Sequence, residues 1–150
     1  MARRAKIGAT PRLVDVAWQR YKSAVPKSKL DLRVGILDEG ELAFIGTVNE
    51  FGSSDGHVPA RSFLRSSFDT NKKKYERMLI KGLKAMEQGT PLEGTVEAIG
   101  ITHVADTKKK ITKLRIPINA PQTVRRKLSS NPLIDTGLMR QVIEYEVIEE

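Results

Sequence analysis

"NEFGSSDGHVPARSFLRSSFD", residues 49–69, is the stretch that decides the fold, because it places one polar loop between two ordered segments. An apolar and acidic run ends at Phe51-Gly52, a short polar loop follows, and Pro59 leads into a segment with helical spacing. Gly52 allows the chain to turn, and Pro59 stiffens the exit of the loop. We therefore expect Phe51 and Phe63 to anchor the two ends of the loop on the core, while its polar tip projects outward.

Three segments before this loop have distinct periodicities. In residues 41–52, β-branched and aromatic residues favour a strand, whereas apolar residues at three- to four-residue steps favour a helix. We prefer a helix that ends with Gly52 in the position after the cap. In residues 30–37, "LDLRVGIL", apolar and charged side chains alternate, which is typical of a half-buried strand. Residues 11–25 have the spacing of a short amphipathic helix that Pro26 ends.

Two long helices are predicted after the loop. From Ser62 to about Met86, six large side chains share one face and lysines occupy the opposite face. The six are Leu64, Phe68, Tyr75, Leu79, Leu83 and Met86. "TPLE", residues 90–93, has the pattern of a capping box with Thr90 as the N-cap of a second helix, which Pro117 ends. Gly100 in the middle of that helix indicates close packing, for which the preceding helix is the candidate partner.

The last part of the chain returns to strand spacing. Residues 118–132 are loop-like, although Ala120 to Lys127 could form a helical turn. "VIEYEVIE", residues 142–149, alternates like a strand that would pair with residues 30–37. The sequence therefore predicts an α+β fold, with a small, mostly antiparallel sheet packed against two long helices. We divide the chain into an extended basic arm and helix at 1–29 and a single domain at 30–150.

The charge of the chain is unevenly distributed. The net charge is +8, and residues 1–30 carry eight basic side chains against one acid, Asp15. The final seven residues, "EYEVIEE", carry four glutamates and no base. This asymmetry indicates a polyanionic partner or head-to-tail contact between subunits, or simply solvated faces. The absence of cysteine excludes disulfides and thiolate chemistry, and no apolar run has the length of a membrane span.

Signatures of catalysis are weak. No glycine loop has the spacing of a phosphate-binding motif, and neither His57 nor His103 has a second ligand one helical turn away. Asp135, followed by Thr136 and Gly137, is typical of a turn or a helix cap. We expect no enzyme activity and no metal or cofactor site. The charge suits phosphate contacts, but stacking aromatics and a recognition helix are missing, so nucleic-acid binding is the alternative function.

Two longer stretches carry a family pattern. They are "VNEFGSSDGHVPARSFLRSSFD", residues 48–69, and "NAPQTVRRKLSSNPLIDTGLMRQVIEYEV", residues 119–147. Together they resemble the neck or tail-completion proteins of long-tailed bacteriophages, a group often labelled virion-morphogenesis or minor tail proteins. The family pattern is an apolar segment ending in "EFG", a short variable loop, "IPARPF", a long helix, and a late "PLIDTGxLxxSI" that leads into a terminal strand.

The resemblance covers roughly residues 30–148 and leaves the basic arm outside. The matching residues are Glu50, Phe51 and Gly52 in the first element, Val58, Pro59, Ala60, Arg61 and Phe63 in the second, and Pro132 to Gly137 with Leu138, Ile143 and Tyr145 in the last. Three positions depart from the pattern: Ser62 replaces a proline, Val142 replaces a serine, and Met139 is the residue two after Gly137. None of these changes removes a group that chemistry would need.

The resemblance implies a non-enzymatic structural protein of the virion, assembled in the host cytoplasm. It would form a ring, which we expect to be a hexamer, in the stack that joins the DNA-filled head to the tail. Its partners would be other copies of itself, head-completion or connector proteins, and tail-terminator or tail-tube proteins, with DNA passing through the lumen. The residues that we expect to shape the loop and the interfaces are Phe51, Gly52, Pro59, Arg61, Phe63, Asp135, Thr136 and Gly137. Arg61 has three candidate roles: pairing with Asp135, pairing with an acid of a neighbour, or covering apolar surface with its stem.

Overall fold

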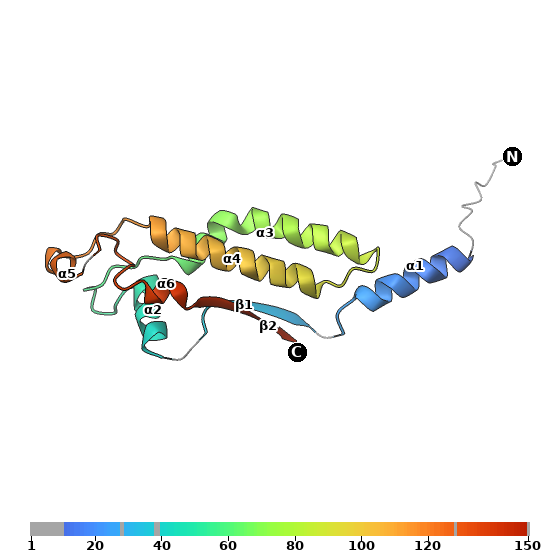
Figure 1. Cartoon of the computed structure of the whole chain (residues 1–150), viewed down its shortest axis with the longest axis horizontal. Coiled ribbons are helices and arrows are strands. Elements are labelled where there is room, and N and C mark those ends of the chain that lie inside the picture. Colours follow the sequence, from blue (N-terminus) through green and yellow to red (C-terminus); the bar gives the residue numbers. More distant parts are fainter. Residues whose placement is uncertain (1–10, 28, 38–39, 128, 150) are drawn as a thin grey trace.

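The structure is a computed structural model, and it describes residues 11–27, 29–37, 40–127 and 129–149. Of the predicted basic arm and helix at 1–29, residues 1–10 and 28 lie outside these ranges. The helices are α1 (Pro11–Ala24), α2 (Glu41–Phe51), α3 (Leu64–Met86), α4 (Glu93–Lys113), α5 (Pro121–Arg126) and α6 (Leu138–Gln141), and the strands are β1 (Leu30–Ile36) and β2 (Ile143–Glu149). Figure 1 shows an elongated molecule in which α1 projects from one end, while α2 and α5 lie toward the other end. The predicted α+β class is confirmed.

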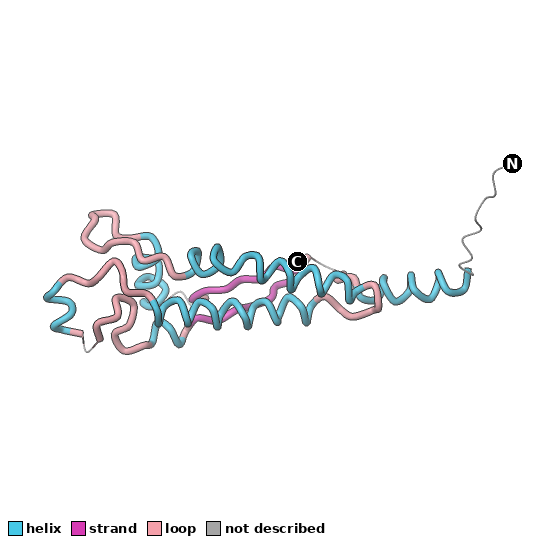
Figure 2. Tube along the Cα trace, turned by 90° about the horizontal axis from the view of Figure 1, so that it is seen from above, coloured by secondary structure: helices cyan, strands magenta, loops and turns pink. Residues whose placement is uncertain are grey.

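The sheet consists of two antiparallel strands drawn from the two halves of the chain. Leu30 lies opposite Glu149 and Ile36 lies opposite Ile143, as the alternation in both segments predicts. The sheet packs mainly against α4, and α3 packs on α4, so that the two long helices run side by side over the strands (Figure 2). Within the part of the chain that the structure describes, no third strand extends this sheet. Each strand therefore has one outer edge that no other described strand pairs.

Gly100 explains how α4 approaches the sheet so closely. A Cβ atom added at Gly100 would lie 2.5 Å from a ring carbon of Tyr145 and 3.0 Å from a methyl carbon of Leu32. The predicted close packing is confirmed, but the partner is the sheet and not the preceding helix. The contact between α3 and α4 uses a different glycine, Gly82 of α3, which faces the side chain of Thr95.

The predicted capping box is wrong. The N-cap of α4 is Leu92, without a side-chain cap, and the helix begins at Glu93. Thr90 instead completes the end of α3, because its N–H donates to the Ala85 carbonyl at 3.2 Å. The preceding Gly89 has a φ of +90°, the left-handed conformation that closes many helix ends. The Thr90 N–H, which would bond the Glu93 side chain in a capping box, is thus already used at the end of α3.

The buried core lies where the start of α3, the last part of α4, α6 and the start of β2 meet. Phe63 and Ile111 are fully buried there, and they are joined by Leu133, Met139 and Ile143. This cluster combines the start of α3 with the late segment before β2, so the two motif regions of the sequence meet in one core.

The apolar face predicted for α3 is covered only in part. Tyr75 and Met86 are buried, but Phe68, Leu79 and Leu83 are exposed. The reason is that α3 packs mainly on α4, which leaves the flanks of its apolar stripe uncovered. No helix in the described ranges combines the length and the apolar run that crossing a bilayer requires.

Candidate functional site

Glu50, the penultimate residue of α2, caps the start of α3. Its carboxylate accepts hydrogen bonds from the backbone N–H groups of Phe63, Leu64 and Arg65 at 2.7, 2.9 and 3.1 Å. It also accepts one from the Ser62 hydroxyl at 2.6 Å. Helix α3 has Phe63 at its N-cap position, which offers no side-chain cap. A distant carboxylate therefore satisfies the orphan donors of the first turn.

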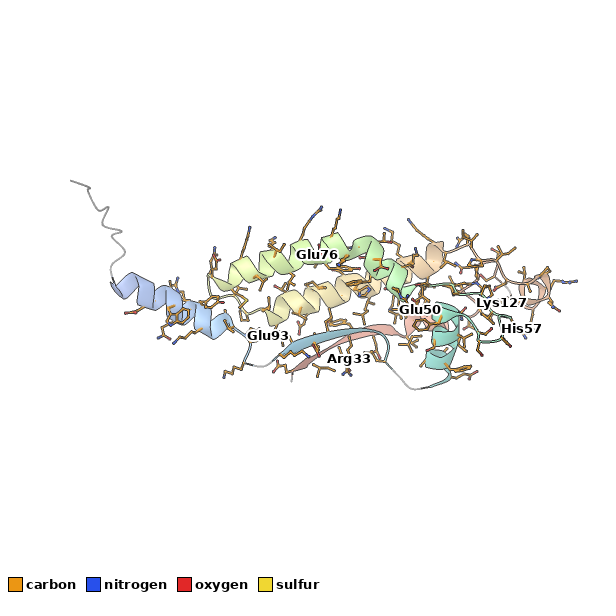
Figure 3. All side chains as sticks on the ribbon, turned by 180° about the vertical axis from the view of Figure 1, so that it is seen from behind. Arg33, Glu50, His57, Glu76, Glu93 and Lys127 are labelled. Atoms are coloured by element: carbon orange, nitrogen blue, oxygen red, sulfur yellow. The ribbon has the colours of Figure 1, made fainter. Side chains whose placement is uncertain are left out.

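The environment of Glu50 keeps it ionised. Only 6% of the residue is exposed, and burial by itself raises the pKa of a carboxyl group. The hydrogen bonds from Ser62 and from the three backbone N–H groups outweigh burial and leave the pKa of Glu50 below its ordinary value. The charge is thus stabilised by the start of α3, and Figure 3 shows Glu50 at the junction of the two helices.

The loop after α2 is closed by its own hydrogen bonds. Gly52 has a φ of +84°, and a Cβ atom added there would lie 3.1 Å from the carbonyl oxygen of Val58. The Ser53 N–H donates to that same carbonyl at 2.9 Å, and the Arg61 N–H donates to the Asn49 carbonyl at 2.6 Å. The predicted role of Gly52 as the turning residue agrees with this geometry. The exposed Pro59 lies between the two closing hydrogen bonds.

The tip of the loop is organised around Asp55. The Asp55 carboxylate accepts from the Ser53 hydroxyl at 2.5 Å and from the His57 N–H at 3.1 Å, and it lies 3.0 Å from His57 Nδ1. These contacts, above all the hydrogen bond from Ser53, lower the pKa of Asp55. Both side chains are well exposed. The loop tip is therefore polar and already ordered, so it can contact a neighbouring molecule without first being ordered.

The two phenylalanines of the motif, Phe51 and Phe63, differ in burial. Phe63 is fully buried, as predicted, but 64% of Phe51 is exposed, so its predicted role as a core anchor is wrong. Neighbouring residues of a helix point about 100° apart. Because Glu50 takes the inward position, Phe51 turns outward. Its ring lies 5.5 Å from the Arg65 guanidinium carbon.

Arg61 ties the loop to the late segment through backbone atoms. Its Nε donates to the Pro117 carbonyl at 2.8 Å and its Nη2 donates to the Ile118 carbonyl at 3.0 Å. Only 5% of the residue is exposed, and burial lowers the pKa of Arg61. Neither carbonyl belongs to an acid, so the predicted pairing with Asp135 is wrong. The fork of the guanidinium suits two adjacent carbonyls, and this contact leaves Asp135 exposed.

The segment Asp135-Thr136-Gly137 forms the turn that starts α6. Gly137 is the N-cap with a φ of +86°, and the Leu138 N–H donates to the Thr136 hydroxyl at 3.3 Å. The interpretation of this segment as a turn agrees with the geometry, although Thr136 and not Asp135 supplies the side-chain contact. Burial lowers the pKa of Lys127, and the negative charge of Asp135 raises it. Burial is the larger effect, so the pKa of Lys127 lies below its ordinary value.

A hollow of about 570 Å³ brings most of these residues together. It lies between α2, the loop and the segment from Ile118 to Met139, and its lining includes the following predicted residues: Pro59, Arg61, Asp135, Thr136 and Gly137. Phe51, Gly52 and Phe63 do not line it. His57 and Lys127 also line it, and Figure 3 places both at the same end of the molecule. The lining of the hollow carries both signs of charge.

A polar cluster between α3 and α4 holds His103. The Tyr75 hydroxyl donates to Asp106 at 2.8 Å, Lys74 forms an ion pair with the same carboxylate, and the His103 ring lies 5.1 Å from the Tyr75 ring. Burial is the main cause that lowers the pKa of His103 and raises that of Tyr75. Among the described residues, no group of three histidine or acidic side chains could hold a metal ion. His103 is a packed helix residue, as predicted.

One exposed apolar surface of the molecule, which we call the α1 surface, consists of Trp18 and Tyr21 of helix α1 and of Val25, which follows the helix. All three are exposed, and the Trp18 and Tyr21 rings stack with their centroids 5.9 Å apart. Every side chain from Asp15 to Ser23 is exposed, whereas Ala24 is buried where α1 joins the body.

Helix α2 carries a second exposed apolar surface, which we call the α2 surface: Phe44, Ile45 and Phe51. Phe44 is 70% exposed, and Phe44 and Phe51 lie seven residues apart on the same face of the helix. Ile116 and Ile118 are 78% and 74% exposed and belong to the same end of the molecule. Sequence periodicity missed both surfaces, because a period predicts an apolar face without telling whether the chain itself covers it.

Comparison of the chain with protein-family models, with curated proteins and with solved structures finds no match.

Proposed function

We propose that this chain is a structural subunit of the neck of a long-tailed bacteriophage, in the ring that joins the DNA-filled head to the tail and lets DNA pass. The resemblance of the loop and late segments to neck and tail-completion proteins motivates the proposal. The observation that carries it is the pair of unlike apolar surfaces at opposite ends of one elongated chain, the α1 surface and the α2 surface.

Unlike surfaces are what a ring subunit requires. A closed ring is built from heterologous contacts, in which one surface of each copy meets a different surface of the next. An isologous dimer would instead need one self-complementary patch. Aromatic side chains as exposed as Trp18 and Phe44, at 52% and 70%, indicate surfaces that a partner covers. We take the ring to be a hexamer, as the family resemblance implies.

The remaining surfaces suit the neighbours above and below such a ring. The preformed loop tip at residues 53–57 offers polar contacts to an adjacent layer, either a head-completion or connector protein or a tail-terminator or tail-tube protein. The protein would be assembled in the host cytoplasm and located in the virion. No catalytic group takes part in this function.

Electron microscopy of assembled particles, combined with a symmetry count, tests the proposal. We expect density for the protein at the junction of head and tail, with six copies around the axis. Purified full-length protein should give closed rings by negative-stain imaging and six-copy complexes by native mass spectrometry. Absence of the protein from the junction, or only two-fold dimers in the particle, would overturn the proposal.

One observation favours a second function, that of a nucleic-acid-binding accessory protein. The outer face of α3 carries five exposed basic residues: Lys72, Lys73, Arg77, Lys81 and Lys84. Such a stripe suits the phosphate backbone of duplex DNA. Tight, salt-dependent binding of free duplex DNA by the monomer would favour this alternative. The neck subunit should bind DNA weakly, because DNA has to move through the ring.

A further inference from the structure

We propose that α1 of one copy docks on α2 of the next copy, so that these two helices form the contact between successive subunits. The inference rests on the proposed ring and identifies which surfaces meet in it. The occupant of the exposed face of α1 is thus a second copy of this chain.

The first step is that α1 is largely uncovered by its own chain. Its described side chains from Asp15 to Ser23 are all exposed, and it packs on the end of α3 and on the following turn, where Arg20 lies against Gly89. A helix of 14 residues is marginal in water without tertiary packing. The stacked Trp18 and Tyr21 therefore need a cover from outside the chain.

The second step is the charge around the two surfaces. Residues 11–29 carry five basic side chains and one acid, and Lys22, whose Nζ lies 5.2 Å from the centre of the Trp18 ring, borders the α1 surface. Residues 37–60 carry five acids and neither lysine nor arginine. Glu50 is consumed inside the fold, and the exposed Glu41 lies at the start of α2. Docking α1 on α2 brings a basic apolar helix onto an acidic apolar segment.

The third step is geometric. Helix α1 is about 21 Å long and α2 is about 16 Å long, because each residue adds about 1.5 Å, so the two can lie side by side over most of their length. They lie toward opposite ends of the same molecule in Figures 1 and 2, so one copy does not make this contact with itself. Each docked copy presents its own α2 to the following copy. Contact between two α1 helices through this surface is disfavoured, because it would bring Lys22 of both copies together.

Cysteine crosslinking tests the contact directly, because the chain has no native cysteine. Gln19→Cys lies beside the α1 surface, and Thr47→Cys lies between Phe44 and Phe51 on α2; both native residues are exposed. The two full-length variants are mixed and treated with a short bismaleimide. We expect a crosslinked dimer in the mixture and little from either variant alone. Lys73→Cys, exposed on α3, is the matched control.

Three outcomes would overturn the docking. Gln19→Cys alone could crosslink to itself, which indicates contact between two α1 helices. Lys73→Cys could crosslink as efficiently as Thr47→Cys, which indicates random collision. Rings could form without any crosslink between positions 19 and 47, and then the ring proposal survives while the docking fails. Conversely, crosslinked subunits that form open chains and never close into rings would contradict the ring proposal and support the docking of α1 on α2.

A charge exchange provides the second readout. Lys22→Glu places a negative charge opposite an acidic segment, and we expect subunit association to weaken by about tenfold in Kd, measured by analytical ultracentrifugation. Adding Glu41→Lys in the same chain should restore association to within about threefold of the original. Circular dichroism checks that each variant is folded. Equal association of the original chain and Lys22→Glu would contradict the docking.

Discussion

Removing the Glu50 carboxylate should destabilise the fold through the loss of its hydrogen bonds to the start of α3. Glu50→Ala deletes the acceptor of three backbone N–H groups and of the Ser62 hydroxyl. The Phe63 N–H is buried, and leaving such a donor unsatisfied costs about 1–3 kcal/mol. Loss of a helix cap adds about 1 kcal/mol, so the free energy of unfolding should fall by about 2–4 kcal/mol.

Glu50→Gln separates shape from charge. The amide keeps the volume and one carbonyl oxygen, which can still accept from Phe63 and Leu64. Its NH₂ group then faces the Arg65 N–H, so two donors meet, and we expect a loss of about 1–2 kcal/mol. Urea unfolding followed by far-ultraviolet circular dichroism measures both variants. Glu76→Ala, an exposed acid on α3, is the control and should change stability by less than about 0.5 kcal/mol.

The pH dependence of stability tests the sign of the pKa shift of Glu50. The folded-state pKa of Glu50 is lower than its ordinary value of 4.5. Its contribution is therefore complete above the pKa of the unfolded chain and is lost as the pH falls through the folded value. The stability gap between the original chain and Glu50→Gln should be constant near neutral pH and narrow below about pH 4.5. A gap that widens with acid, or a Glu50→Ala variant as stable as the control, would refute the capping role.

Three further changes test the packing. Phe63→Ala should cost about 3–5 kcal/mol in chemical unfolding, whereas the exposed Phe51→Ala should cost less than about 1 kcal/mol and impair assembly instead; equal losses would contradict the burial assigned to the two rings. Gly100→Ala should cost about 1–3 kcal/mol by overpacking, whereas Gly94→Ala, whose added methyl group meets open space, should be neutral or stabilising by up to about 1 kcal/mol in thermal unfolding. Arg61→Lys keeps the charge but cannot engage two carbonyls at once, so a loss of about 1–3 kcal/mol is expected by calorimetry, and unchanged stability would show that the fork contributes nothing.

Local patterns predicted the secondary structure well and its environment less well. The alternation in β1 and β2 is a direct record of one buried face, so their pairing was readable from the sequence. Helix α2 was readable because Gly52 marks its end. Thr90 was misread because two helix ends compete for the same backbone, and a capping motif does not show which end wins.

The candidate site was harder to predict because its contacts join distant positions. Glu50 caps a helix that starts 14 residues later, and Arg61 binds carbonyls more than 50 residues away. One signal was available for Glu50: an acid lies inside an apolar helix, and the helix that follows the loop has Phe63 where a polar cap is usual. No comparable signal identified which of Phe51 and Phe63 is buried, since that depends on the side chosen by Glu50.

The pairing of β1 with β2 sets the order in which the chain can fold. Arg33 and Glu146 lie opposite each other although 113 residues separate them. Closing so long a loop costs entropy that only a preformed scaffold can offset, whereas α3 and α4 meet across a short turn. The hairpin of α3 and α4 is thus the natural folding nucleus, and β1 and β2 pair on it late. Until then α4 shows the face around Gly100 to solvent, and nascent subunits pass through a stage at which they could capture a β2 strand from another copy.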